Sequence, residues 1–259
     1  MTISFSKYQG TGNDFVIIDN RLDIFPKDDT KLVAQLCDRK FGIGADGLML
    51  LESHPSADFR MVYYNADGNE SSMCGNGGRC LVAFAKALSL IDTHATFEAV
   101  DGMHEATVKD GIVHLKMQDV EEIKTTPEYS FLDTGSPHHI KMVSDVKAVA
   151  VKEEGAAIRY GALYGEAGSN INFVQELEDG HFAVRTYERG VEDETLSCGT
   201  GVTAVAIAAH HNGVTSKNNI QLDVEGGKLA VSFTKTATGY TDVYLIGPAT
   251  FVFKGEWQC

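Results

Sequence analysis

Apolar residues recur along this chain in short runs separated by polar turns, which is typical of β-strands. Residues 59–64 and 182–187 are rich in aromatic and β-branched residues, and an acidic loop follows each run. Similar β-rich runs lie at residues 14–19, 107–116, 171–176, 220–224, 228–233 and 242–246. Helical patterns are few, at residues 30–38 and 144–154 and in two Ala-rich stretches. The pattern predicts an α+β protein with a mostly antiparallel sheet.

The two halves of the chain carry similar segments. Each consists of an acidic loop, a Cys-Gly-x-Gly turn and an Ala-rich apolar stretch, with Cys74 in the first half and Cys198 in the second. The two cysteines lie 124 residues apart in a chain of 259. This spacing indicates two similar domains, each with one copy of the segment. The polar stretch at residues 118–128 is a plausible boundary between them.

Composition narrows the class of protein. The chain has 22 Lys and Arg against 36 Asp and Glu, a formal charge of −14, which argues against a nucleic-acid or membrane partner. The N-terminus has no apolar signal region and no run reaches the roughly 20 residues of a membrane span, so we expect a cytoplasmic protein. Five cysteines, an odd number, fit reduced thiols. The Cys and His spacings predict no metal site.

Cys74 and Cys198 are the candidate catalytic residues, because each precedes a glycine-rich turn at the start of a predicted helix. Glycines let backbone amides approach a ligand, and the positive end of the helix dipole favours thiolate over thiol. Inverting an amino-acid α-carbon requires a base on one face, an acid on the other and donors for the developing negative charge. Two such turns supply all three, so the sequence predicts a racemase or epimerase without a cofactor. Cys37, Cys80 and Cys259 lack this context and are interpreted as structural or incidental.

Several motifs, in order and along nearly the whole chain, resemble the diaminopimelate epimerase family. They are Gly12-Asn13-Asp14-Phe15, Asp46-Gly47-Leu48, Asn65-Ala66-Asp67-Gly68, Cys74-Gly75-Asn76-Gly77, Pro137-His138, Asn170 within Ser-Asn-Ile-Asn-Phe, Glu188-Arg189-Gly190 and Cys198-Gly199-Thr200-Gly201. The resemblance implies two pseudosymmetric domains, each a mostly antiparallel β-sheet or barrel around a central helix. We place the domains at residues 1–120 and 121–250, and expect residues 250–259 to pack back onto the first.

The same resemblance implies a reaction and a set of roles. The family interconverts LL- and meso-diaminopimelate, in lysine and peptidoglycan-precursor biosynthesis, with Cys74 and Cys198 exchanging protons at opposite faces of one stereocentre. The amides of Gly75, Asn76, Gly199 and Thr200 would hold the reacting carboxylate, Asn13, Asn65, Asn170, Glu188 and Arg189 would contact other polar groups of the substrate, and His138 and Glu188 would tune the thiols. The residue types agree, since arginine matches a carboxylate with two planar donors. We expect a small-molecule amino-acid substrate and a homodimer.

Three departures from the family pattern concern recognition of the distal end of the substrate. Ser136 stands where the family usually has Asn, Gly47 replaces a side chain that reaches the ligand in some members, and the loop at residues 191–194 is one residue longer than usual.

Two alternatives stay open. The first is another amino-acid racemase of the same superfamily, acting on histidine or a proline derivative. The proline-type enzymes usually carry His at the position of Asn76, whereas a histidine racemase would share both cysteines. The second alternative is a redox-sensing binding protein without turnover, in which Cys74 and Cys198 form a reversible disulfide.

Overall fold

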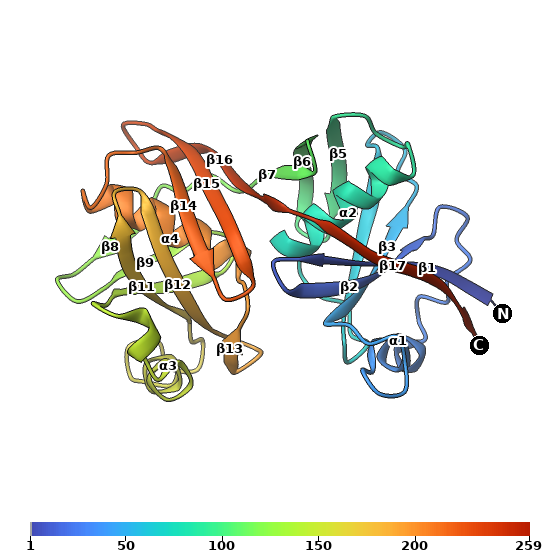
Figure 1. Cartoon of the computed structure of the whole chain (residues 1–259), viewed down its shortest axis with the longest axis horizontal. Helices are drawn as coiled ribbons and strands as arrows, with labels where there is room; N and C mark the ends of the chain where they lie inside the picture. Colours follow the sequence, from blue (N-terminus) through green and yellow to red (C-terminus); the bar gives the residue numbers. More distant parts are fainter. Residues whose placement is uncertain (1) are drawn as a thin grey trace. The chain divides into compact units, whose positions relative to one another are not determined.

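A computed structural model describes residues 2–259 and divides the chain into two compact units (Figure 1). The first unit is Met1–Leu115 together with Gly247–Cys259, and the second is Lys116–Ile246. These boundaries lie a few residues before the positions 120 and 250 expected from the sequence. Each unit is described below by itself.

The first unit is a mixed sheet in the order β17-β1-β2-β3-β4-β5-β6-β7. Its elements are β1 (Thr2–Gly10), β2 (Asn13–Asp19), α1 (Thr30–Cys37), β3 (Gly47–Glu52), β4 (Phe59–Asn65), α2 (Gly75–Ala87), β5 (His94–Ala99), β6 (Gly102–Lys109), β7 (Ile112–Lys116) and β17 (Thr250–Gln258). Neighbouring strands are antiparallel except β2–β3 and β4–β5, whose connections contain α1 and α2. The C-terminal strand β17 pairs with β1 from Thr2↔Gln258 to Gln9↔Thr250 (Figure 1).

The second unit is a mixed sheet in the order β8-β9-β10-β11-β12-β14-β15-β16, with β13 also paired to β12. Its elements are β8 (Ile123–Thr125), β9 (Ser130–Asp133), β10 (Pro137–Met142), a 3₁₀ turn (Val146–Ala148), α3 (Val151–Arg159), β11 (Asn170–Glu178), β12 (His181–Glu188), β13 (Asp193–Thr195), α4 (Gly199–His211), β14 (Asn219–Val224), β15 (Gly227–Lys235) and β16 (Tyr240–Pro248). The parallel pairs are β10–β11 and β12–β14.

The repeat extends well beyond the two cysteine segments. Starting from β1 and from β9, successive strands pair in the same order of directions: antiparallel, parallel, antiparallel, parallel, antiparallel, antiparallel. The helices α2 and α4 fall at the same step, in the second parallel crossover. The predicted α+β fold with two pseudosymmetric domains is therefore confirmed.

Each sheet packs around one helix. In the first unit α2 packs against β1, β2, β3 and β6, and in the second α4 packs against β9, β10, β11, β14 and β15. Most residues of α4 from Gly199 to Ala209 are buried, which explains why the helix is apolar on all sides and shows no amphipathic stripe. The start of each helix is consequently held by the surrounding core.

Two predicted elements differ from the structure. Residues 107–116, expected to be one β-rich run, form the hairpin of β6 and β7, because Asp110-Gly111 adopts the positive φ angles of 51° and 79° that suit a tight turn. Residues 144–154, expected to be helical, contain the short 3₁₀ turn capped by Asp145, after which Val149 is extended and α3 begins only at Val151. Aspartate at a turn start and a β-branched residue after it both favour this break.

Candidate active site

Cys74 and Cys198 occupy the same structural position, the N-cap of the central helix in each unit. Their backbones are both extended, with φ −113° and ψ 122° at Cys74 and φ −118° and ψ 109° at Cys198. The carbonyls of both cysteines accept the first intrahelical hydrogen bonds, from Gly78 N at 2.7 Å and Val202 N at 3.0 Å. Neither cysteine caps its helix with its side chain. Each thiol therefore stands at the positive end of a helix, where amides favour an anion.

The second glycine of each Cys-Gly-x-Gly turn has a packing role. A Cβ atom on Gly77 would overlap the Cε methyl of Met49, and one on Gly201 would lie 2.6 Å from Asn172 Oδ1. Both glycines therefore face strands of the sheet, β3 in the first unit and β11 in the second. The sequence interpretation assigned both glycines of each turn to close approach of a ligand, and the structure adds a packing role for Gly77 and Gly201.

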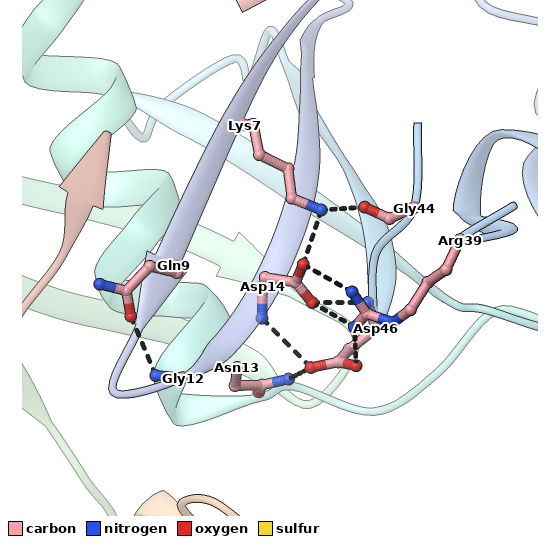
Figure 2. Close-up of polar contacts among 8 residues, drawn as sticks. All are labelled: Lys7, Gln9, Gly12, Asn13, Asp14, Arg39, Gly44 and Asp46. Atoms are coloured by element: carbon pink, nitrogen blue, oxygen red, sulfur yellow. Dashed lines mark hydrogen bonds and ion pairs between the residues drawn. The ribbon is translucent and has the colours of Figure 1, made fainter. Parts of the chain in front are cut away.

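The Cys74 cluster comprises Cys74, Asn13, Asn76 and Asp46. Cys74 Sγ lies 3.6 Å from Asn13 Oδ1, and Asn76 Nδ2 donates to the same oxygen at 3.3 Å. Asn13 Nδ2 donates to Asp46 Oδ2 at 2.7 Å (Figure 2). Because a carboxylate only accepts, it fixes the amide of Asn13 with its carbonyl oxygen directed to the thiol.

An ionic network around Asp14 and Asp46 lies next to Asn13, as Figure 2 shows. Arg39 Nη2 lies 2.7 Å from both Asp14 Oδ1 and Asp46 Oδ1, and Lys7 Nζ lies 2.7 Å from Asp14 Oδ2 and donates to the carbonyl of Gly44. Burial alone would raise the pKa of Asp14, but hydrogen bonds from Arg39 and Lys7 outweigh it and lower this pKa to about 2. Both carboxylates are paired with cations, and the lowered pKa of Asp14 keeps its ion pairs with Arg39 and Lys7 in place at moderately acidic pH.

Arg79, which the sequence interpretation missed, is fully buried within α2. Its guanidinium donates to Asn76 Oδ1 at 3.0 Å and Thr11 Oγ1 at 3.2 Å, with backbone carbonyls of Gly75 and Pro248 at 3.5 and 3.4 Å. These partners are all uncharged, and burial lowers the pKa of Arg79 without removing its charge. A buried cation thus lies in the first turns of α2 and orients Asn76. The signal in the sequence was a lone arginine inside an apolar helix.

The Cys198 cluster comprises Cys198, Thr200, His138, Asn172 and Thr186. Cys198 Sγ lies 3.5 Å from Thr200 Oγ1, which lies 2.9 Å from His138 Nε2. His138 Nδ1 lies 3.2 Å from Asn172 Nδ2, and Thr186 Oγ1 donates to Asn172 Oδ1 at 3.0 Å. Burial, and then the positive charge of Arg189, lower the pKa of His138 to about 3, so the ring is neutral. The sequence interpretation assigned no role to Asn172 or Thr186.

Asn170 and Ser136 form a second group in this unit. Asn170 Nδ2 donates to Ser136 Oγ at 2.9 Å and to the Pro137 carbonyl at 3.0 Å, while its Oδ1 accepts from Arg189 N at 2.9 Å. Asn170 is only 3% exposed, and its amide ties two loops together. Ser136, one of the departures from the family pattern, is therefore part of the scaffold around the backbone of Arg189.

The remaining predicted contact residues lie at strand ends. The exposed Arg189 follows β12 and donates through Nη1 to the Ala167 carbonyl at 2.9 Å, and Glu188 Oε2 accepts from Thr195 Oγ1 at 2.9 Å. Asn65 is exposed at the end of β4, in a turn where Gly68 N donates to its carbonyl at 3.0 Å. These residues thus lie at the ends of strands of their own units, Asn65 at the end of β4, Glu188 at the end of β12 and Arg189 directly after it.

Gly47, another departure from the family pattern, has a local explanation. A Cβ atom there would lie 2.5 Å from the Tyr63 ring and from the Tyr64 carbonyl. A side chain at this position would displace β4, so the glycine is required by packing.

The other cysteines have different surroundings. Burial raises the pKa of both Cys37 and Cys80 to about 12, and Cys259 is exposed at the C-terminus.

Among residues 2–259, no three His, Cys, Asp or Glu side chains gather as they would around a metal ion. No helix in the described part of the chain is long and apolar enough to cross a membrane.

Solved structures share this fold. The structure of a PhzF-family phenazine biosynthesis protein from Bacillus anthracis has a TM-score of 0.80 at 14% identity and covers 100% of both chains. A hydroxyproline epimerase from Agrobacterium vitis has a TM-score of 0.69 at 14% identity, over 98% of this chain and 92% of the other. At these identities the likeness concerns the fold alone.

The repeated sheet carries a cysteine at the start of each central helix, and the sequence matches known isomerases. The chain is therefore an isomerase. The sequence profile of diaminopimelate epimerase matches residues 5–122 and 130–252. The diaminopimelate epimerase of Flavobacterium psychrophilum is 60% identical over 249 residues, 96% of this chain and 97% of the relative. That of Chlorobaculum tepidum is 40% identical over 255 residues, 95% and 98% of the two chains. The chain therefore belongs to the diaminopimelate epimerase family, as its motifs predicted.

Proposed function

We propose that this chain interconverts LL-2,6-diaminopimelate and meso-diaminopimelate by proton transfer at one α-carbon, without a cofactor. The observation that carries the proposal is the equivalent placement of Cys74 and Cys198, each as the N-cap of a central helix with the same extended backbone. The substrate is that named for relatives up to 60% identical to this chain. The reaction belongs to lysine and peptidoglycan-precursor biosynthesis in the cytoplasm.

The chemistry needs two sulfur atoms in different protonation states. One thiolate removes the α-proton and becomes a thiol, while the electron pair of the broken C–H bond delocalises into the α-carboxylate. The amides of Gly75, Asn76, Gly199 and Thr200 stabilise the charge that develops on that carboxylate. The second thiol then delivers its proton to the opposite face of the carbon and is left as a thiolate. Proton and charge balance, and the configuration is inverted.

Recognition of the rest of the substrate is assigned to residues at strand ends. We propose that Arg189 binds a carboxylate and that Glu188, Asn13, Asn65 and Asn170 complete the polar contacts. Asn170 contributes through the loop that it holds, since its own amide is hydrogen-bonded to Ser136, Pro137 and Arg189.

The experiment is solvent exchange. The enzyme is incubated in D2O with LL-diaminopimelate, L-histidine or L-proline, and deuterium at the α-carbon is followed by mass spectrometry together with the stereoisomer formed. We expect incorporation and inversion with diaminopimelate alone. Exchange with histidine in place of diaminopimelate would assign a histidine racemase, and binding without any exchange would assign a non-catalytic protein.

Two further proposals concern the state of the protein. With a charge of −14 and no basic cluster in the sequence, we propose no nucleic-acid or membrane partner. We propose that the enzyme is a homodimer, which light scattering coupled to size exclusion tests directly. A mass near 28.1 kDa would correspond to the monomer and overturn it.

A further inference from the structure

The hydrogen bonds of the Cys198 cluster have a direction that the uncharged donors and acceptors determine. Asn172 Nδ2 lies 3.0 Å from the backbone carbonyl of His139, which can only accept. The amide nitrogen must therefore face this carbonyl, and Asn172 Oδ1 must face Thr186, whose hydroxyl donates to it. With both ends satisfied, the amide of Asn172 has one orientation.

This orientation determines the tautomer of His138. The second hydrogen of Asn172 Nδ2 points to His138 Nδ1 at 3.2 Å, so Nδ1 is the acceptor. His138 is fully buried and neutral, with a pKa of about 3, and carries a single ring proton. That proton must be on Nε2, from which it is donated to Thr200 Oγ1 at 2.9 Å.

Thr200 follows Asn172 and His138 in this chain of hydrogen bonds. Its hydroxyl oxygen accepts from His138, so its own hydrogen points elsewhere, and Cys198 Sγ lies 3.5 Å away. A hydroxyl that donates to sulfur stabilises the thiolate and not the thiol.

We propose that Asn172 is a positioning residue that, through the fixed tautomer of His138, makes Thr200 donate its hydroxyl hydrogen to Cys198 and so stabilises the thiolate of Cys198. This inference rests on the proposed function, in which Cys198 acts as a base. No proton needs to move along the hydrogen bonds from Asn172 to Thr200, since these residues act only by orienting one another.

The first unit provides a comparison, because other residue types stand at the positions that match His138 and Asn172. The strand registers Phe15↔Gly47 and His138↔Asn170 align the two units, so Phe15 matches His138 and Met49 matches Asn172. The corresponding positions beneath α2 are therefore apolar. Cys74 instead lies beside Asn13 Oδ1, an acceptor to which a thiol donates. The two cysteines thus have neighbours of opposite polarity.

Charged and titratable groups lie near the Cys198 cluster on several elements. Arg189, after β12, acts on His138 through its positive charge. Glu188, at the end of β12, accepts a hydrogen bond from Thr195 on β13. His138 itself is on β10, and the positive end of α4 carries Cys198. Since none of these groups is altered by the substitutions below, their effect on Cys198 is constant across the series.

The test measures alkylation by iodoacetamide at each cysteine, by peptide mapping, from pH 5.5 to 9.5. In the unmodified enzyme we expect the half-maximal rate at Cys198 at a lower pH than in Thr200→Val, by about one to two pH units, the size expected for one hydrogen bond to a charged group. Thr200→Ser keeps the hydroxyl and should restore the original midpoint. The pH dependence is compared, and not the absolute rate, because Cys198 is less exposed than Cys74.

The matched control is Thr203→Val, which removes a hydroxyl from the same helix. Thr203 Oγ1 donates to the Gly199 carbonyl at 2.9 Å and takes no part in the Cys198 cluster. Its variant should leave the midpoint of Cys198 in place. Asn172→Met, which installs the residue of the first unit, should raise the midpoint at Cys198 and leave that of Cys74 unchanged, with folding verified by circular dichroism.

An unchanged midpoint in Thr200→Val would overturn the proposal, as would a shift in Thr200→Val that a folded Asn172→Met does not reproduce. If Asn172→Met does not fold, a normal midpoint in Asn172→Asp, whose carboxylate has no hydrogen to donate to His138 Nδ1, would overturn it equally. Failure of the proposed function has a different signature, because epimerisation would then survive in Cys198→Ala whatever the alkylation midpoints are.

Discussion

Asn172 on β11 and Met49 on β3 occupy the same position in the two repeated sheets, each directly beneath the third residue of a cysteine-capped helix. One is a polar side chain held by hydrogen bonds to Thr186, His138 and the His139 carbonyl, and the other is a flexible thioether. The two units therefore share a backbone plan but differ in how freely the layer beneath each helix can adjust.

This difference predicts unequal effects for the same substitution in the two units. In Gly77→Ala the new methyl meets the mobile end of Met49, and the gain in helix propensity of roughly 0.5–1 kcal/mol offsets much of the strain. In Gly201→Ala it meets the amide of Asn172, which cannot move without losing hydrogen bonds. We expect a loss of about 2–3 kcal/mol for Gly201→Ala and less than about 1 kcal/mol for Gly77→Ala. Urea unfolding measures both, and equal losses would contradict the argument.

The ionic network next to Asn13 predicts a pH dependence of stability. The pKa of Asp14 is lowered to about 2 from an ordinary value of 3.8, so its contribution is present above pH 3.8 and is lost as the pH falls toward 2. The shift corresponds to about 2 kcal/mol. Asp14→Asn should lower the free energy of unfolding at pH 7 and flatten its dependence between pH 4 and 2. Unfolding in urea at several pH values tests this, and an unaltered slope in the variant would be evidence against the role of Asp14.

Substrate recognition by Arg189 is tested by a substitution that keeps the charge. An ammonium cannot reproduce the two parallel donors of a guanidinium, so Arg189→Lys should raise KM by roughly tenfold, about 1.4 kcal/mol of binding. Arg60, an exposed arginine on β4, provides the control, since Arg60→Lys should leave KM unchanged. A normal KM in Arg189→Lys would show that substrate binding does not depend on the two planar donors of the guanidinium.

The proposed chemistry makes a simple prediction for three cysteines. Cys74→Ala and Cys198→Ala should each abolish epimerisation, because inversion needs an acid and a base. Cys80→Ala should keep most of the activity, since Cys80 is buried in α2 and burial raises its pKa to about 12. Turnover of purified, folded variants is the measurement, and activity near that of the parent in either of the first two would exclude the two-base reaction.

Much of this architecture was accessible from the sequence because it repeats. Two Cys-Gly-x-Gly turns before Ala-rich stretches predicted two similar domains and both N-cap cysteines, and the structure extends the repeat to the order of strand directions. The strand pairing of Thr2 with Gln258 could not be derived in this way, because residues at opposite ends of the chain share no local pattern.

The supporting residues of the site were harder to find. Asn172 and Thr186 lie within ordinary β-rich runs, and their function depends on His138 from a third strand. Such a network has no spacing signature, since its members are brought together only by sheet register. Arg79 did stand out in an apolar helix, but its neutral partners, among them Thr11 and the Pro248 carbonyl, come from remote parts of the sequence.

Arg79 gives the last prediction, which separates stability from activity. A fully buried guanidinium with uncharged partners is costly to desolvate, and replacing buried charges by apolar side chains of similar volume is often neutral or stabilising. Arg79→Met should therefore change the free energy of unfolding little, within about 1 kcal/mol, or raise it. Activity should nevertheless fall, by about tenfold or more, because Asn76 loses the donor that orients its amide and the start of α2 loses a positive charge. Arg79→Lys keeps the charge without the planar donors and should retain more activity than Arg79→Met. Urea unfolding and kcat/KM are measured on the same preparations. If Arg79→Met were strongly destabilised and fully active once folded, Arg79 would serve the packing of α2 alone and its charge would have no part in the reaction.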